Sequence, residues 1–245
     1  SVNFVRGTIS NDNYENYTWN NVKLSGASSF DVSIENGDGS SGSVIKINVV
    51  QELSSSGGSK QTMRYTVYSS GEITVTSSLQ MAPTMGEMAK YGNVIVLPGA
   101  YENVVYYGQG ENYNDRSRGA MVGLYTTTVS DMFYPYCNPQ DTGNRTGVRY
   151  IALTSDSSDI GILVVAEGLI EASAIHYTPA ELTAARNTYH LDGSNEFTYL
   201  NVDYGSRGVG SGSCGPATLP QYRLYNDGRD YTYTYTIVPF EKGDD

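Results

Sequence analysis

The sequence predicts an all-β protein, built as an antiparallel sandwich of many short strands with one short helix. Apolar and polar residues alternate with period two in many short runs, which is the pattern of strands that turn one face toward a core. The runs are rich in β-branched and aromatic residues, and clusters of Gly, Asn, Asp and Ser separate them, as at residues 36–39 and 69–71. Many such runs with a single helical stretch favour an antiparallel sandwich over an α/β fold.

The first third of the chain is predicted to consist of hairpins. Apolar and polar residues alternate there in four runs, which contain Phe30, Val32 and Ile34; Ile45, Ile47 and Val49; Met63, Tyr65 and Val67; and Ile73 and Val75. The serine and glycine run at residues 54–59 lies between two of these strands. It is expected to form an exposed, flexible hairpin loop.

Further strands are expected in the remainder of the chain. They cover residues 93–97, 103–107, 120–128, 147–154, 161–166, 172–176, 198–204, 221–225 and 231–238. In the last of them tyrosine alternates with threonine, so that Tyr231, Tyr233 and Tyr235 share one face. We expect this tyrosine row to be buried against the second sheet; a sugar-binding platform is the alternative.

One stretch carries the signals of a helix N-terminus. Thr178 can cap the helix, Pro179 suits its first position, and Glu181 completes a capping box with Thr178. The one short helix is therefore expected near residues 179–187.

The length and the charge of the chain limit its class. Its 245 residues suit a single β-sandwich domain over residues 1–245. The formal net charge of −11 repels phosphate backbones and anionic lipids, so no nucleic-acid or membrane partner is expected. Abundant Asn, Ser, Thr and Tyr favour an extracellular or cell-surface parent over a cytoplasmic one, and the localisation stays open.

Residues that commonly carry chemistry are scarce. Cys137 and Cys214 are expected to be free thiols, because sequence separation alone gives no reason to pair them. His176 and His190 lack an acid or a cysteine at the spacing of a metal site, so partly buried, hydrogen-bonded roles are expected.

Charged residues gather in two segments. Glu111 and Asp115 lie close to Arg116, and salt bridging within the chain is the expected role of such neighbours. Arg145 and Arg149 are two of the few cations in an acidic chain. We expect them to hold carbonyls or carboxylates within the fold, and contact with another domain is the alternative.

Four blocks of the chain carry glycines, prolines and charged residues at offsets that no strand or helix period requires. In chain order they are Phe4–Asp12, Tyr107–Arg116, Tyr136–Tyr150 and Gly208–Pro216, with His176–Leu182 before the last. Their composition and order resemble the C-terminal β-sandwich, also called the small chain or domain 5, of the β-galactosidases of glycoside hydrolase family 2. The resemblance extends over nearly the whole chain.

The resemblance implies a large antiparallel β-supersandwich of the galactose mutarotase type. It also implies that the chain is the C-terminal fragment of a larger multidomain enzyme, a retaining β-galactosidase that hydrolyses terminal β-D-galactosides. In that family both catalytic glutamates belong to an upstream barrel domain. The isolated chain is therefore expected to have no catalytic residue and no activity. No cofactor or metal is expected in this domain, and other domains would hold any Mg or Na of the parent.

The same resemblance identifies site residues. In the family, the loop that matches Gly208–Pro216 reaches into the pocket of the barrel beside the bound sugar. The substrate-proximal edge of this chain is therefore expected at Ser213, Cys214 and Gly215. Some members carry tryptophan where this chain has Cys214, so tight stacking on the sugar is put in doubt here. Candidate sugar or interdomain contacts are expected at Glu111, Tyr113, Arg116, Arg145 and Arg149.

Two other functions stay open at this stage. A stand-alone carbohydrate-binding module for galactose-type sugars would present Tyr106, Tyr107 or Tyr113 to solvent in a concave site. An independent epimerase or lyase would need His176 and His190 to converge with an acid over a sugar ring.

Overall fold

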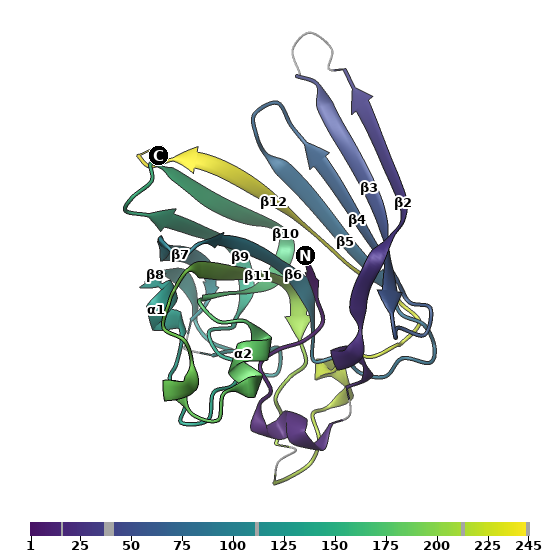
Figure 1. Cartoon of the computed structure of the whole chain (residues 1–245), viewed down its shortest axis with the longest axis vertical. Coiled ribbons are helices and arrows are strands. Elements are labelled where there is room, and N and C mark those ends of the chain that lie inside the picture. The colour runs from purple at the N-terminus through teal and green to yellow at the C-terminus, as the bar shows by residue number, and fades with distance from the viewer. Residues whose placement is uncertain (16, 37–41, 111–112, 212–213, 244–245) are drawn as a thin grey trace.

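The computed structural model describes residues 1–15, 17–36, 42–110, 113–211 and 214–243. Within these ranges, twelve antiparallel strands form one continuous sheet with two short α-helices beside it (Figure 1). The strands are β1 Val2–Asn3, β2 Lys23–Glu35, β3 Val44–Ser54, β4 Lys60–Val67, β5 Ile73–Gln80, β6 Lys90–Pro98, β7 Tyr101–Gln109, β8 Val122–Thr128, β9 Arg145–Ser155, β10 Ile160–Ile175, β11 Phe197–Ser206 and β12 Tyr231–Glu241. The helices are α1 Val129–Met132 and α2 Pro179–Ala184. The expected all-β class is confirmed.

The sheet has one main path and one branch. The path runs β1-β6-β11-β10-β12-β5-β4-β3-β2, and the branch leaves β10 through β9 to β7 and β8. Figure 1 shows β2 to β5 side by side on one side of the molecule, while most of the other strands form a second, curved layer. The segments that follow β1 and β11 gather at the end opposite the tips of β2 and β3. That end holds the candidate site.

Strand β10 joins the two parts of the sheet because it bends in the middle. Its first half pairs with β12, its second half pairs with β11, and β9 runs along both halves with a register shift between them. At the bend Gly168 has φ +103, a conformation that residues with a side chain rarely adopt. The two strands expected at 161–166 and 172–176 are therefore one bent strand.

The tyrosine row of β12 forms part of the core, as expected. Tyr231, Tyr233 and Tyr235 are all buried, and the ring of Tyr233 meets that of Tyr91 edge-on at 5.7 Å between centroids. The hydroxyl of Tyr233 donates a hydrogen bond of 2.8 Å to the carbonyl of Val202 on β11. The buried Tyr233 ring therefore packs against another aromatic ring, and its hydroxyl keeps a hydrogen bond.

Helix α2 begins as the sequence predicts. The Thr178 hydroxyl accepts a hydrogen bond from the Glu181 amide at 3.2 Å, and the Glu181 carboxylate accepts one from the Thr178 amide at 2.7 Å. The helix ends at Ala184, earlier than expected, because the backbone of Ala185 is extended. The single turn of α1, capped by the Thr128 hydroxyl, was not predicted.

One local expectation is wrong. Residues 221–225 are not a strand: a 3₁₀ turn covers Pro220–Tyr222, and Leu224 enters the core from irregular backbone.

The run at residues 54–59 forms the expected hairpin connection between β3 and β4, and most of it is exposed. Two of its serines are nevertheless buried and hold the turn. The buried hydroxyl of Ser56 donates to the Leu53 carbonyl at 2.6 Å, and that of Ser59 accepts from the Ala82 amide at 2.9 Å.

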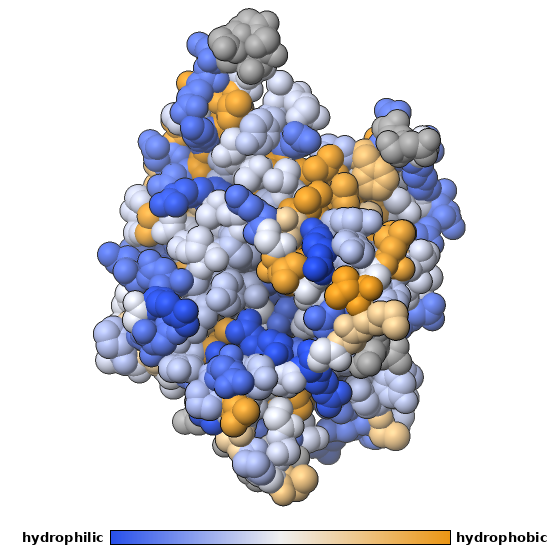
Figure 2. Space-filling view, turned by 180° about the vertical axis from the view of Figure 1, so that it is seen from behind, coloured by the Kyte–Doolittle hydropathy of each residue, from blue (hydrophilic) through white to orange (hydrophobic). Residues whose placement is uncertain are grey.

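Several apolar side chains stay on the outer face of the sheet. Figure 2 shows a group of them on the side opposite the view of Figure 1. The register places exposed Leu124 on β8 opposite Tyr107 on β7, and Tyr107 opposite Tyr150 on β9. These residues share a face that points away from the core.

A matched pair of leucines tests which face holds the core. Leu200 on β11 is fully buried, whereas Leu124 is 64% exposed. We expect Leu200→Ala to lower the free energy of unfolding by about 2–5 kcal/mol, and Leu124→Ala to change it by less than about 0.5 kcal/mol. Urea unfolding of both variants measures this difference. Equal losses would contradict the assignment of the core.

Candidate functional site

The four blocks singled out in the sequence meet at one end of the molecule. The Asp141 amide donates to the Gly7 carbonyl at 3.1 Å, which joins the third block to the first. The Asn11 side chain donates to the Val209 carbonyl at 2.9 Å, and the Val209 amide donates to Asp115 at 3.2 Å. The glycine-rich loop thus contacts both the first and the second block.

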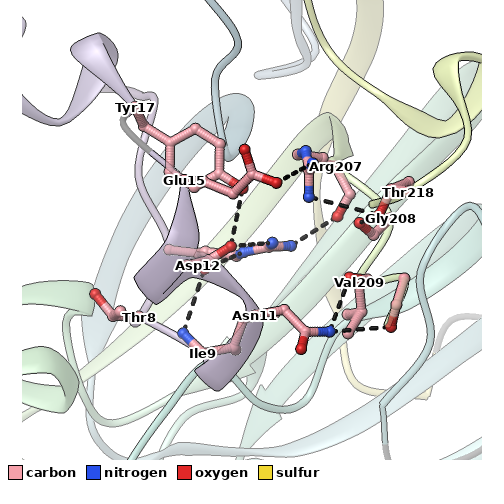
Figure 3. Close-up of polar contacts among 12 residues, drawn as sticks. Thr8, Ile9, Asn11, Asp12, Glu15, Tyr17, Arg207, Gly208, Val209 and Thr218 are labelled. Carbon is pink, nitrogen blue, oxygen red and sulfur yellow. Dashed lines mark hydrogen bonds and ion pairs between the residues drawn. The ribbon is translucent and has the colours of Figure 1, made fainter. Parts of the chain in front are cut away.

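A buried ion pair organises the first block. The Arg6 guanidinium donates two hydrogen bonds to the Asp12 carboxylate, at 3.0 and 2.7 Å (Figure 3). Its remaining Nη atom donates to the Arg207 carbonyl at 2.7 Å. Asp12 also accepts from the Tyr17 hydroxyl at 2.9 Å and from the Ile9 amide at 3.2 Å. Every polar group of this buried pair is therefore engaged.

Arg207 fixes the start of the glycine-rich loop. Its guanidinium, almost fully buried, donates to Glu87 and to Glu15, each at 2.6 Å. Glu87 accepts a further hydrogen bond from Arg223 at 2.9 Å. Figure 3 shows Glu15, Tyr17 and Arg207 on one side of Asp12, with Val209 on the other. The backbone before the loop is thus anchored by its carbonyl and by its side chain.

A second group of buried charges lies on β6, β10 and β11. Lys90 and Asp203 form an ion pair of 3.0 Å, with both side chains buried. Burial raises the pKa of Asp203 to about 7, although the Lys90 charge opposes that shift. Burial likewise raises the pKa of Glu171, against the opposing effect of Arg116. Both carboxyl groups are buried inside the chain.

The base of the glycine-rich loop is held by Thr218. Gly210 has φ +61, and a Cβ atom there would lie 2.3 Å from the Thr218 hydroxyl. That hydroxyl donates to the Gly208 carbonyl at 2.8 Å. Cys214 and Gly215 beyond this base are exposed, while Ser213 lies outside the described residues. Of the expected substrate-proximal edge, the structure thus places Cys214 and Gly215 on an exposed loop with a fixed base.

Both cysteines are free, as expected, and both are exposed. The Cys214 thiol lies on the outward loop, and the Cys214 amide donates to the Ser211 carbonyl at 3.1 Å. Cys137 lies in the third block. The two free thiols therefore lie in different segments of the chain.

A cavity of about 330 Å³ lies between the first block and the glycine-rich loop. Its lining consists of Ile9, Ser10, Asn11, Tyr113, Arg118, Tyr136, Gln140, Asp141 and Val209. All four blocks or the segments directly beside them contribute to it. Two of the lining residues each have a polar atom buried away from solvent: Tyr113 Oη and Asp141 Oδ2 have no hydrogen-bond partner in the described part of the chain. Burial raises the pKa of Tyr113 well above its usual value, although the Arg6 charge opposes that shift.

The candidate arginines make contacts within the chain. Arg116 lies 3.9 Å from Glu171 and stacks over the Tyr204 ring at 5.7 Å. Buried Arg145 donates to the Tyr106 hydroxyl at 3.0 Å. These contacts agree with structural roles, and interdomain contact stays a prediction.

Arg149 and Glu111 complete the set of candidate residues. Arg149 donates to the Gly147 carbonyl at 2.7 Å and lies over the Tyr107 ring at 5.2 Å. Glu111 lies outside the described residues. Of the four candidate contacts that the structure describes, Tyr113 is the one that lines the cavity described above.

The tyrosines that would mark a carbohydrate-binding module are in three different environments. Tyr106 is buried, which removes it from any sugar surface. Tyr107 is partly exposed on the outer face, beneath Arg149. Tyr113 lines the cavity. The sugar-binding alternative therefore concentrates on Tyr113.

The histidines do not form a catalytic pair. His176 lies 2.9 Å from both the Glu102 carboxylate and the Phe197 carbonyl, so each of its ring nitrogens already has a partner. His190 packs against the Tyr189 ring at 4.4 Å. His190 lines a cavity with Glu181 and Asp192, and His176 is not part of that lining. The two rings therefore do not converge over one site, which counts against an independent epimerase.

Sequence reasoning did not single out Asp141, Arg207 or Glu87. Asp141 lies inside the third block, Tyr136–Tyr150, but no second catalytic residue stands at a recognisable spacing from it. Arg207 precedes the glycine-rich loop, and its rarity as a cation in an acidic chain was the available signal. Glu87 carried no signal at all, because its partners lie 120 and 136 positions away.

Two general properties complete the description. Within the described ranges, no three His, Cys, Asp or Glu side chains are grouped as a metal ion would require. None of the helices in these ranges has the length and apolar character needed to cross a membrane.

Comparison with known proteins connects this geometry to a family. A model of the family described as "Beta galactosidase small chain" matches residues 1–237. The chain belongs to this family. The small chain expected from the four sequence blocks is thereby confirmed.

Curated relatives of this small chain are named β-galactosidases. The protein of Priestia megaterium is 36% identical over 178 residues, which are 71% of this chain and 17% of the relative. That of Kluyveromyces lactis is 24% identical over 249 residues, covering 97% of this chain and 23% of the relative. The chain thus spans about a fifth of the length of the relatives it matches.

Among solved structures, the fold is similar to that of a galactose mutarotase-like protein from Lactobacillus casei. The two chains share 9% identity with a TM-score of 0.43, over 86% of this chain and 73% of the other.

The buried Arg6–Asp12 pair gives a testable difference in stability. Asp12→Ala leaves the Arg6 charge buried without its carboxylate partner, and we expect a loss of about 3–5 kcal/mol in the free energy of unfolding. Glu35→Ala is the matched control, since it removes the acid of the exposed Lys46–Glu35 pair. That variant should lose no more than about 1 kcal/mol. Urea unfolding that gives similar losses for both variants would contradict the structural role of the buried pair.

Proposed function

We propose that this chain is the C-terminal domain of a retaining β-galactosidase of glycoside hydrolase family 2. The complete enzyme hydrolyses terminal β-D-galactosides, and this domain completes the mouth of its active site. The observation that carries the proposal is the meeting of four separated blocks at one end of the sandwich, with the glycine-rich loop held outward by Arg207, Thr218 and Asn11. Family membership and the names of the relatives support it.

The charges of the chain support a catalytic centre in another part of the enzyme. Retaining hydrolysis uses two carboxyl groups about 5 Å apart that flank the bond to be cleaved. Two of the buried carboxylates of this chain instead have cationic partners of their own: Asp12 with Arg6 and Asp203 with Lys90. Both pairs are buried. We therefore assign the acid/base and the nucleophile to an upstream barrel domain, which would also hold any metal ion of the parent.

In this proposal, the domain shapes and closes the mouth of the active site. The ion pairs beneath the glycine-rich loop hold its base in one position, which lowers the ordering cost of docking this end of the domain on the barrel. Ser213, Cys214 and Gly215 form the edge nearest the substrate. A thiol at position 214 presents less surface to a sugar ring than an indole would, so the leaving group is held loosely.

Hydrolysis of a chromogenic β-galactoside tests the assignment of catalysis. We expect the 245-residue chain alone to show no turnover and the longer natural polypeptide to be active. The comparison uses equal molar amounts of each protein and o-nitrophenyl β-D-galactopyranoside as the substrate. Turnover by the chain alone would place a catalytic carboxyl pair within its own residues and overturn the proposal.

The two free cysteines test the role of the loop. In the longer polypeptide, Cys214→Trp adds an aromatic surface at the substrate edge, and we expect KM to fall about two- to tenfold with kcat little changed. Cys137→Trp is the matched control, because Cys137 is also a free, exposed thiol. Steady-state kinetics with an aryl galactoside measure the effect. Equal KM and kcat values for the two variants would contradict the placement of Cys214 near the substrate.

A further inference from the structure

We propose that the free edge of β6 binds the residues that precede Ser1 in the longer polypeptide. These residues continue β1 as an antiparallel strand, and the second residue before Ser1 pairs with Val96. The inference rests on the proposed function, because it requires that the parent enzyme precede this chain. It adds the surface on which this domain receives the preceding segment.

The pairing of β1 with β6 includes the first residue of the chain. Val2 lies opposite Asn93 in an antiparallel register, and Figure 1 shows the N-terminus beside β6. The Ser1 amino group donates to the Val94 carbonyl at 2.8 Å, and the Ser1 carbonyl accepts from the Val94 amide at 2.7 Å. Such an exchange of two hydrogen bonds is the repeating unit of an antiparallel ladder. The chain is therefore in register with β6 from Ser1 onward.

Strand β6 continues beyond this pair and leaves part of its edge open. It ends at Pro98, four residues after Val94, and on its other side it pairs with β11 as far as Pro98. The backbone groups of successive strand residues face alternate sides. The Val96 amide and carbonyl therefore face the side of β1, as those of Val94 do. Among the described residues, no strand pairs with this part of the edge.

The open edge has room for one more pair of backbone hydrogen bonds. Continued in the same register, the first residue before Ser1 lies opposite Ile95 and the second lies opposite Val96. Pro98 is the next residue whose backbone faces this side, and it has no amide to donate. The edge thus fixes both the register of the added strand and its short length.

The side chains of β6 indicate which residues suit the added strand. Ile95 and Leu97 pack against the core and are only partly buried, as is Val2, whereas Val96 points outward and is 53% exposed. Residues directly opposite each other in a sheet share a face. The first and third residues before Ser1 therefore lie beside Ile95 and Leu97. We expect apolar side chains at both positions.

The register also determines the end from which the preceding polypeptide arrives. Strand β6 begins at Lys90, opposite Ser206 and next to the start of the glycine-rich loop, and ends at Pro98, opposite Phe197. Residues before Ser1 lie progressively closer to Pro98. The parent polypeptide therefore enters this domain from the end opposite the glycine-rich loop.

The test is a designed disulfide in the longer natural polypeptide. Val96→Cys is combined with a cysteine in place of the second residue before Ser1, while Cys137→Ser and Cys214→Ser remove the free thiols of this chain. Residues in a hydrogen-bonded antiparallel pair have Cα atoms about 5.5 Å apart, which a disulfide can span. After mild oxidation, mass spectrometry of the non-reduced digest should find most molecules cross-linked between these two positions.

The matched control moves one cysteine by a single position. Val96→Cys with a cysteine at the first residue before Ser1 places the two side chains on opposite faces of the sheet, so we expect cross-linking to fall about tenfold or more. Circular dichroism of the reduced proteins checks that both variants fold.

Two results would overturn the inference. One is the absence of the cross-link at the second position in a folded polypeptide. The other is equal cross-linking in both variants, because the segment would then have no fixed register. Hydrolysis of the chromogenic β-galactoside by the unaltered longer polypeptide is measured separately. Turnover without the cross-link counts against this inference alone, and the cross-link without turnover counts against the proposed function alone.

Discussion

The functional end of this molecule depends on the buried contact of Arg6 with Asp12 and with the Arg207 carbonyl. A guanidinium is always charged and offers its donors in a fixed plane, so its burial requires acceptors at defined positions. Asp12 supplies two of them, and the Arg207 carbonyl, directly before the glycine-rich loop, supplies the third. The contact therefore sets the distance between the N-terminal segment and a loop 201 positions away.

The other charges extend this arrangement. Arg207 carries the connection onward to Glu15 and Glu87, while Asn11 holds the loop from its opposite side. The result is a glycine-rich loop whose base is fixed by hydrogen bonds, and a cavity whose walls come from segments far apart in the chain. Such a construction suits a domain that must present a surface to a partner and keep it in one position. It also explains why these carboxylates are unsuited to catalysis, since their charges are already matched within the fold.

The parts of the structure that were predicted from sequence depend on neighbouring residues. The capping box of Thr178 and Glu181 involves atoms three positions apart, and the tyrosine row of β12 follows from the period of a strand. The wrong expectations concern residues whose state is set from a distance. Leu224 has the alternation of a strand, yet it is buried from irregular backbone beside Arg223, which the Thr218 carbonyl holds at 2.6 Å.

The sequence by itself determined the all-β class, the start of α2 and the membership of the β-galactosidase small chain family, because these depend on local chemistry and on the order of short motifs. Only the tertiary structure decided which charges meet and which polar atoms stay without partners. It joined two expected strands into β10, and it separated Tyr113, in the cavity, from Tyr106, in the core. The physical reason is that burial and pairing depend on the register and bending of a sheet assembled from the whole chain, and no local window of sequence contains that information.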